Sequence, residues 1–449
     1  MSADGSGPHY ALRCAGCGRE TPDDGLTTAC RECGDSALLR TRYADRAFPV
    51  GPEVSAASGI FRYARWLPVR REVPGSCLPA VHRSEGLAAA LGLTDLWISF
   101  SGYWPEMGCH METGTFKELE AYTVLARIPE NAGTLVVASA GNTAAAFASA
   151  CRRSGTRCLL VVPEFALRAL EFGAPGEGWG RAVRVLGLPG ATYNDAITYA
   201  ARLVASSPAY VGEGGVRNVG RRDGLAVIAL AAYEAMGRLP DVYVQAVGSG
   251  AGALGVHEAA TRILAAAPGG RLPRLLLCQN AARAPLRDAW HGTRDGRTGG
   301  APSPPAPDPA SYAPELLNSA PPFATAGGVR EALRASGGTV LVADEDAARR
   351  AAALFEEREG IDIEPPAAVA VACLREAVRT GRIAPRARIL LNVTGGGRER
   401  LRRERLRRAP RVRATATGRA REPEGGTGGK GGPPVAGSGA GVRSWGSPR

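Results

Sequence analysis

The chain has 449 residues and a formal net charge of +12 at neutral pH. This length allows two or three domains with a sizeable core. No stretch approaches the run of about 20 apolar residues that spans a bilayer, and no targeting signal is present, so we expect a soluble cytoplasmic protein without membrane partners. The charge is concentrated in residues 398–449, where 14 basic and 4 acidic residues give +10 and leave +2 for the rest. Composition alone therefore does not indicate a nucleic-acid-binding body.

Two cysteine pairs lie within the first 45 residues. Cys14 and Cys17 form one Cys-x-x-Cys turn, Cys30 and Cys33 form the other, and each is followed by glycine. Four thiolates in this arrangement can coordinate one tetrahedral metal ion. So short a segment has too small a hydrophobic core to fold without a metal ion or another cross-link. The pattern predicts a zinc-ribbon-like segment over residues 1–45 with a structural metal, zinc, held by these four cysteines. A redox or nucleic-acid role is the alternative.

From about residue 85 to residue 393, apolar strands alternate with helical stretches. After a helix at 85–91, the predicted strands are 96–100, 134–138, 158–163, 182–186, 241–247, 274–279 and 387–393. Continuous apolar strands between helices indicate parallel sheets covered on both faces, and hence an α/β domain over residues 46–397. Residues 296–328 interrupt the pattern with a Pro-rich insertion too long for an ordinary connection. The insertion is either a mobile flap or disordered.

Lys117 lies where a glycine-containing turn gives way to a run of helix formers. A cation at a helix N-terminus opposes the helix dipole, which favours the neutral amine or an imine. That is the state required of a lysine that forms a Schiff base. The alternative is an ordinary surface lysine.

A second motif, Ser139-Ala-Gly-Asn-Thr143, follows a strand and opens a helix. Its backbone N–H groups and the helix dipole form an anion site that suits a substrate carboxylate. We therefore assign substrate binding to Ser139, Ala140, Gly141 and Thr143. Asn142 either reaches a ring oxygen of a cofactor or caps the helix.

A glycine loop and a threonine end two later strands. In Gly248-Ser-Gly-Ala-Gly252 the glycines let the backbone close around a phosphate, with a dinucleotide fold as the competing interpretation. No acidic residue ends the following strand, which argues against that competitor. Thr394 offers a hydroxyl; facing a pyridine nitrogen, it would keep the ring neutral and favour replacement at Cβ over transamination. Otherwise it is only a turn residue.

The C-terminal segment predicts a short basic helix over residues 398–408, followed by a Gly-, Pro- and Ser-rich stretch that we expect to be disordered. A solvated extension accounts for this basic tail, 398–449, better than a weak contact with RNA or an acidic surface.

Taken in order, four motifs resemble those of fold type II pyridoxal-phosphate enzymes, specifically the threonine synthase family: Thr115-Phe-Lys117, Ser139-Ala-Gly-Asn-Thr143, the glycine loop at Gly248, and Thr394-Gly-Gly. Five longer segments look more closely like the cysteate synthase branch of that family: 96–106, 115–121, 137–143, 245–250 and 390–397. The zinc-ribbon-like N-terminus also occurs in members of the family. The resemblance extends from about residue 10 to Gly397.

The resemblance implies a tryptophan synthase β-like fold of two three-layer α/β subdomains with mainly parallel sheets, the smaller and mobile one at about 95–215. It implies that Lys117 forms a Schiff base with pyridoxal 5′-phosphate and that Asn142 hydrogen-bonds the cofactor's 3′ oxygen. Thr394 would face the pyridine nitrogen. A homo-oligomer, dimer or trimer, is also expected. The phosphate would be held by Gly248, Ser249, Gly250, Ala251 and Gly252.

The activity that the resemblance implies is a β-replacement that converts O-phospho-L-serine and sulfite to L-cysteate and phosphate. Where threonine synthases usually have Lys-Asp-Arg, this chain has Lys117-Glu-Leu, which favours the cysteate branch over homoserine phosphate as substrate. The alternative within enzymes is a threonine synthase or another β- or γ-replacement enzyme, such as a sulfhydrylase. The alternative from a different class is a zinc-ribbon nucleic-acid adaptor with a basic tail.

Overall fold

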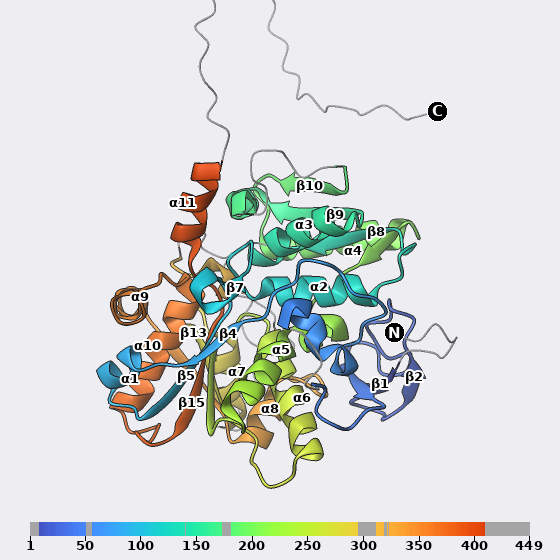
Figure 1. The fold of residues 1–449 in the computed structure, drawn as a ribbon. Helices are drawn as coiled ribbons and strands as arrows, with labels where there is room; N and C mark the ends of the chain where they lie inside the picture. The colour runs from blue at the N-terminus through green and yellow to red at the C-terminus, as the bar shows by residue number, and fades with distance from the viewer. Residues whose placement is uncertain are drawn as a thin grey trace, which may run out of the picture. The chain divides into compact units, whose positions relative to one another are not determined.

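The computed structural model describes residues 9–50, 56–139, 141–172, 181–294, 311–317, 321 and 323–408. They belong to one compact unit, Met1–Ala409, whereas the second unit, Pro410–Arg449, lies outside the described residues. The predicted disorder beyond residue 408 therefore stays a prediction. Within the described chain, strands alternate with helices as the sequence predicts (Figure 1).

The larger sheet has six strands among the described residues. Five run parallel, and β4 pairs antiparallel with β5 at one edge. Every residue of β12 is buried, as expected for an inner strand with both faces covered. The spatial order is β14 (Thr339–Ala343), β13 (Arg274–Asn280), β12 (Val242–Ala246), β15 (Arg388–Val393), β5 (Asp95–Phe100) and β4 (Ala80–Arg83).

Helices cover this sheet on both sides (Figure 1). Helix α10 packs along β12 to β15 and against α9, while α8 packs against β13 and α6, and α6 packs against α5. The bounds of the helices in this part are α1 (Gly86–Leu91), α5 (Val219–Met236), α6 (Ala251–Ala266), α7 (Pro285–Arg294), α8 (Val329–Ser336), α9 (Glu345–Glu359) and α10 (Pro365–Arg379).

The smaller sheet has four parallel strands, in the order β10 (Val183–Leu188), β9 (Cys158–Pro163), β8 (Thr134–Ala138) and β11 (Tyr210–Gly212). Helices α3 (Asn142–Ser154) and α4 (Tyr193–Ser206) and the 3₁₀ helix η3 (Glu164–Phe172) pack around it. The sequence placed the start of the smaller subdomain at about residue 95. Strand β5 instead pairs with β15 in the six-stranded sheet, so the strands of the smaller sheet begin at Thr134.

The N-terminal segment forms a three-stranded antiparallel sheet, β2 (Glu20–Pro22), β1 (Tyr10–Cys14) and β3 (Leu39–Tyr43), followed by the 3₁₀ helix η1 (Ala56–Trp66). Two buried carboxylates join it to the rest of the chain. Asp23 pairs with Arg127 at 2.7 Å, both side chains being fully buried. Asp223 accepts a hydrogen bond of 2.8 Å from the Tyr43 hydroxyl.

Helix α2 (Lys117–Arg127) packs against both α3 and α5, so it connects the two sheets (Figure 1). The close approach of α5 depends on Gly224: a Cβ there would lie 2.5 Å from the Leu119 carbonyl oxygen. The N-terminus of α2 thereby lies between the two halves of the molecule.

Further elements outside the insertion are three short ones and one C-terminal helix. The short elements are β6 (Tyr103–Trp104), η2 (Pro105–Met107) and β7 (Cys109–His110), which precede Lys117. Helix α11 (Arg398–Arg408) is the predicted basic helix. It belongs to the same compact unit as the two sheets and not to the second unit. Within the described chain, no helix is long and apolar enough to cross a membrane.

Part of the Pro-rich insertion is ordered. Residues 311–317 include the 3₁₀ helix η5 (Pro314–Leu316), and Ala326 exchanges backbone hydrogen bonds with Ser36 and Leu38 in the N-terminal segment. These residues have defined contacts, and the mobility of the insertion stays a prediction. Residues 295–310 lie outside the described part.

Candidate active site

A cavity with about 1050 Å³ of empty space, part of it open to solvent, lies where the N-terminal ends of α2, α3 and α6 meet. Three helix N-termini converging on one space favour anionic ligands. Every predicted cofactor- or substrate-binding residue that the structure describes lines this cavity: Lys117, Ser139, Gly141, Asn142, Thr143, Gly248, Ser249, Gly250, Ala251, Gly252 and Thr394. Ala140 lies outside the described residues.

Lys117 is the first residue of α2, as predicted. The turn before it is fixed by the chain that follows β15: the Phe116 N–H donates to the Thr394 carbonyl at 2.9 Å, and Thr115 forms a bridge with Gly395. These backbone contacts bring Lys117 and Thr394 to the same cavity although 277 positions separate them in the sequence.

The environment of Lys117 favours the neutral form of its amine. Burial lowers the pKa of the amine, and the nearby Arg221 lowers that pKa further. Glu120, whose Oε2 lies 3.1 Å from Nζ, raises the pKa of Lys117. Desolvation and charge neighbours therefore set the basicity of this lysine, and the helix dipole is not needed to explain it.

At α3 the helix begins differently from the predicted cap. Gly141 is the N-cap residue and Asn142 is the first helical residue, so the capping role proposed as the alternative for Asn142 is wrong. The Ser139 hydroxyl takes over this function, because Oγ accepts hydrogen bonds from the N–H groups of Gly141 at 3.1 Å and Ala144 at 3.0 Å. Ser139 thus shapes the loop in addition to lining the cavity.

The Asn142 side chain is held at both ends. Its Nδ2 donates to Glu364 Oε2 at 2.9 Å, and its Oδ1 accepts from Arg398 Nη2 at 2.7 Å. Glu364 and Arg398 are ion-paired with each other. An amide nitrogen has two N–H bonds. Because one of them donates to Glu364, the second N–H of Asn142 Nδ2 remains for a ligand in the cavity.

The glycine loop forms the N-terminal end of α6. Gly250 caps the helix with φ of +83°, and a Cβ there would lie 2.5 Å from Val329 Cγ2. A Cβ on Gly252 would lie 2.6 Å from the Gln245 side-chain nitrogen. The positive φ favours glycine at Gly250, and side chains at either position would crowd the loop, which places backbone at the start of α6 beside the cavity as a phosphate site would need.

Several functional candidates were not found from the sequence. Arg221 and Tyr193 line the cavity, and the fully buried Glu120 joins Lys117 to Arg221. Arg398 belongs to a helix that was predicted to be solvated. Their sequence context carried one usable signal: Glu120 lies three residues after Lys117, on the same face of a predicted helix.

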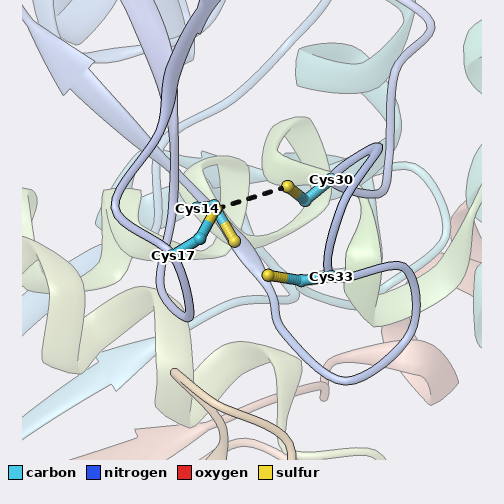
Figure 2. Close-up of side chains that lie close together, drawn as sticks. All are labelled: Cys14, Cys17, Cys30 and Cys33. Carbon is cyan, nitrogen blue, oxygen red and sulfur yellow. Dashed lines mark hydrogen bonds between the residues drawn. The ribbon is translucent and has the colours of Figure 1, made fainter.

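The four N-terminal cysteines come together as predicted (Figure 2). Their sulfur atoms all lie within 4.8 Å of one another, and Cys17 Sγ is 3.7 Å from Cys30 Sγ. Four thiolates at this spacing fit a tetrahedral structural metal such as zinc.

A family model described as "Pyridoxal-phosphate dependent enzyme" matches residues 82–395. The chain belongs to this family. The fold and the cofactor predicted from the motifs are thereby confirmed: the chain is a fold type II enzyme that depends on pyridoxal phosphate. The match ends three residues before Arg398, so that residue lies outside the family's common core.

Curated relatives cover most of the chain. It is 44% identical over 398 residues to the cysteate synthase of Methanosphaerula palustris, which covers 87% of this chain and 91% of that protein. The cysteate synthase of Methanocella paludicola is 42% identical, with 88% and 91% covered. That of Methanosarcina acetivorans is 39% identical, with 88% and 94% covered. The predicted resemblance to the cysteate synthase branch is confirmed.

Solved structures share the fold at low sequence identity. A pyridoxal 5′-phosphate-dependent aspartate racemase has a TM-score of 0.55 at 19% identity, covering 71% of this chain and 90% of that one. Maize serine racemase has a TM-score of 0.55 at 18% identity, covering 73% and 92%. These likenesses support the fold alone.

The cavity fits the family's cofactor. It offers one lysine amine, a glycine loop at a helix N-terminus for a phosphate, a fixed amide at Asn142 and a threonine hydroxyl at Thr394. Lys117 is also one of only two lysines in the sequence, the other being Lys430. Because Lys430 lies in the C-terminal segment, Lys117 is the single candidate for a covalent attachment within residues 9–408.

Proposed function

We propose that this protein converts O-phospho-L-serine and sulfite to L-cysteate and phosphate, with pyridoxal phosphate as its cofactor. The observation that carries the proposal is the 39–44% identity to cysteate synthases over most of both chains. The cavity supports it, since its only described lysine begins α2, and the N-termini of α3 and α6, which suit anionic substrates, line the same cavity.

Each residue has a distinct role in this proposal. Lys117 would hold the cofactor through Nζ, and its free amine would remove the Cα proton of the bound substrate as general base. Residues 248–252 hold the cofactor phosphate through backbone N–H groups at the start of α6. The Asn142 amide binds the 3′ oxygen, oriented by Glu364 and Arg398. Thr394 would offer its hydroxyl to the ring nitrogen, a partner that leaves that nitrogen uncharged.

The bound cofactor supplies an electron sink that makes loss of the Cα proton and departure of the Cβ phosphate possible. The substrate carboxylate binds at the N-terminus of α3, near Ser139, Gly141 and Thr143. Lys117 then returns its proton to Cα after sulfite has added to Cβ, so that the amine is regenerated for the next turnover.

The competing functions have less support. A threonine synthase or a sulfhydrylase would use the same cofactor residues, but the relatives above carry neither name. A nucleic-acid adaptor would leave the cavity and its lysine without a role.

The proposal is tested by incubating purified protein and pyridoxal phosphate with O-phosphoserine and either sulfite or sulfide, and following phosphate and the amino-acid product. O-phosphohomoserine replaces the substrate in a third reaction. We expect phosphate and cysteate together with sulfite, and no threonine from the third reaction. Phosphate release with a product other than cysteate would contradict the proposed nucleophile while preserving the cofactor chemistry.

We also infer a homo-oligomer, dimer or trimer, and a cytoplasmic location. Light scattering on the eluted protein tests the first of these inferences.

A further inference from the structure

The carboxylate of Glu120 touches three elements of the cavity wall. Its side chain is fully buried. Oε2 lies 3.1 Å from Lys117 Nζ on the same helix, and Oε1 accepts a hydrogen bond of 3.0 Å from the Thr143 hydroxyl on α3. Oε1 also lies 3.2 Å from Arg221 Nη1 on α5. One carboxylate therefore connects the lysine, the carboxylate-binding loop and the arginine of the cavity.

Neutralising Arg221 does not require Glu120. Arg221 already has a partner in Glu213, which accepts hydrogen bonds from its Nε at 2.8 Å and its Nη2 at 2.5 Å. A second buried carboxylate would cost free energy unless it served another charge. The remaining charged partner of Glu120 is Lys117. We therefore read the Glu120 carboxylate as the ionic partner of the lysine amine.

We propose that Glu120 holds and orients the Lys117 amine whenever that amine is not bonded to the cofactor, and that Arg221, by sharing the same carboxylate, keeps Glu120 from binding the lysine proton too tightly. This inference rests on the proposed function, because it concerns the lysine as general base. Glu120 acts through Lys117 and is therefore a positioning residue.

The proton balance is simple. When Lys117 acts, the Cα–H bond breaks, the electron pair stays with the substrate and the proton moves to Nζ. The resulting ammonium group then lies against the Glu120 carboxylate, which stabilises it until the proton returns. Neither an oxidant nor another reactant is needed.

The charges around Glu120 come from four elements. They are Lys117 on α2, Arg221 on α5, Glu213 after β11, and the phenol of Tyr193 on α4. Burial and Arg221 lower the pKa of Lys117, whereas Glu120 and Glu213 raise it. Removing the charge of Glu120 alone should therefore lower the pKa of Lys117 further.

The decisive variant is Glu120→Gln, which keeps the shape and an acceptor oxygen. We expect kcat to fall on the order of 10²-fold with KM changed by less than about threefold, because the base is misplaced while substrate binding is kept. The acidic limb of the kcat pH profile should move to lower pH. An unchanged kcat with an unmoved limb would overturn the proposal.

A second measurement needs no substrate and separates this inference from the proposed function. The cofactor is removed, and the rate at which added pyridoxal phosphate restores the visible absorbance is measured against pH, because only the neutral, unbonded Lys117 amine reacts. In Glu120→Gln the midpoint should move to lower pH, because the positive charge at Lys117 has lost its nearby carboxylate. A midpoint equal to that of the unmodified protein would overturn the proposal even if the true substrates differ from those proposed.

Two further variants distinguish the loss of the Glu120 charge from a general structural effect of the substitution. Glu120→Asp restores the charge on a shorter side chain, so its titration midpoint should return toward that of the unmodified protein even if kcat stays low. Glu234→Gln removes a carboxylate from the Arg62 ion pair on α5, away from the cavity, and should move neither readout. If Glu120→Gln does not fold, Glu120→Asp decides: a midpoint shifted to lower pH despite the restored charge would contradict the proposal.

Discussion

Arg398 and Asn142, 256 residues apart in the sequence, are joined by a hydrogen bond of 2.7 Å between Nη2 and Oδ1. Arg398 is the first residue of α11, and its ion pair with Glu364 completes a ring around the Asn142 amide. The C-terminal helix therefore contributes directly to the orientation of a predicted cofactor ligand. Its basic character looked like that of a solvated extension only because the partners lie so far back in the chain.

The first prediction concerns this contact. Burial raises the pKa of Glu364 to about 8 although Arg398 lowers it, so removing Arg398 alone would favour the protonated acid and change the partner of Asn142 as well. We therefore pair Arg398→Met with Glu364→Gln, which preserves an acceptor for Asn142 Nδ2. The double variant should bind pyridoxal phosphate about five- to tenfold more weakly, the worth of one hydrogen bond of about 1 kcal/mol. Equilibrium titration with the cofactor measures the change.

The control for this prediction is Arg400→Met, on the same helix. Arg400 pairs with Glu106 and Glu404 at the surface and contacts no predicted cofactor ligand. Its affinity for the cofactor should match that of the unmodified protein. Equal losses in both variants would mean that α11 acts only by packing.

A second prediction tests the glycine loop. Gly250→Ala places a side chain where φ is +83°, which costs about 1–2 kcal/mol, and drives the new Cβ against Val329. Gly237→Ala, the matched control, has φ of +70° with no atom within 4 Å of the new Cβ. Both variants should lose stability on thermal melting, but only Gly250→Ala should lose affinity for the cofactor. Unchanged affinity in Gly250→Ala would remove the loop from the phosphate site.

A third prediction concerns pH and the buried carboxyl group of Glu118. Burial raises its pKa to about 7, above the ordinary value of about 4.3 that applies in the unfolded chain. The folded protein then binds more protons than the unfolded chain between these values, so this group lowers the free energy of unfolding as pH rises from about 4 to 7. In Glu118→Gln, the free energy of unfolding should fall by up to about 3 kcal/mol less over this pH range than in the unmodified protein.

Denaturant unfolding at pH 4.5 and pH 8 measures this difference. In Glu118→Gln the side-chain amide oxygen can still accept from the Thr113 hydroxyl, which lies 2.8 Å from Glu118 Oε1, so the local contact survives. Glu234→Gln should behave in the opposite sense, because the Arg62 pair lowers the pKa of Glu234 and contributes stability that is lost as pH falls. Identical pH dependence in all three proteins would contradict the assignment.

A fourth prediction concerns the metal. The purified protein should contain one zinc per chain, and a strong chelator should remove it and lower the melting temperature, since the N-terminal sheet has little core of its own. Elemental analysis and thermal melting measure both effects. Cys30→Ser should abolish the bound zinc, while Cys77→Ser, at a half-buried cysteine outside the cluster, should keep it. Zinc retained by Cys30→Ser would place the metal elsewhere.

Much of the fold was predictable because its strands are continuous apolar runs. The strands at 134–138 and 158–163 match the structure residue for residue. Strand β14 was missed, since it is a five-residue strand at the sheet edge with only two buried residues, Val340 and Ala343. The place of β5 was also misjudged, because sequence order does not determine which of two sheets a strand joins.

The site was predictable where a motif coincides with a helix start. Lys117, Gly141 and Gly250 all stand at such positions, and local sequence reveals them. Glu120 and Arg221 were missed because only tertiary packing brings α2 against α5. The pKa of Lys117 is lowered, the direction predicted from its place at a helix start, and burial is the largest cause.

Lys117 is the residue proposed to carry the cofactor, and the composition of the chain makes a direct test possible. Borohydride reduction of the holoenzyme should fix pyridoxal phosphate to its lysine, and only Lys117 and Lys430 are available. Peptide mass analysis should place the label on Lys117 alone; Lys430→Ala should keep the label and the visible absorbance, and Lys117→Ala should lose both. A label on Lys430, or visible absorbance that survives in Lys117→Ala, would contradict the account.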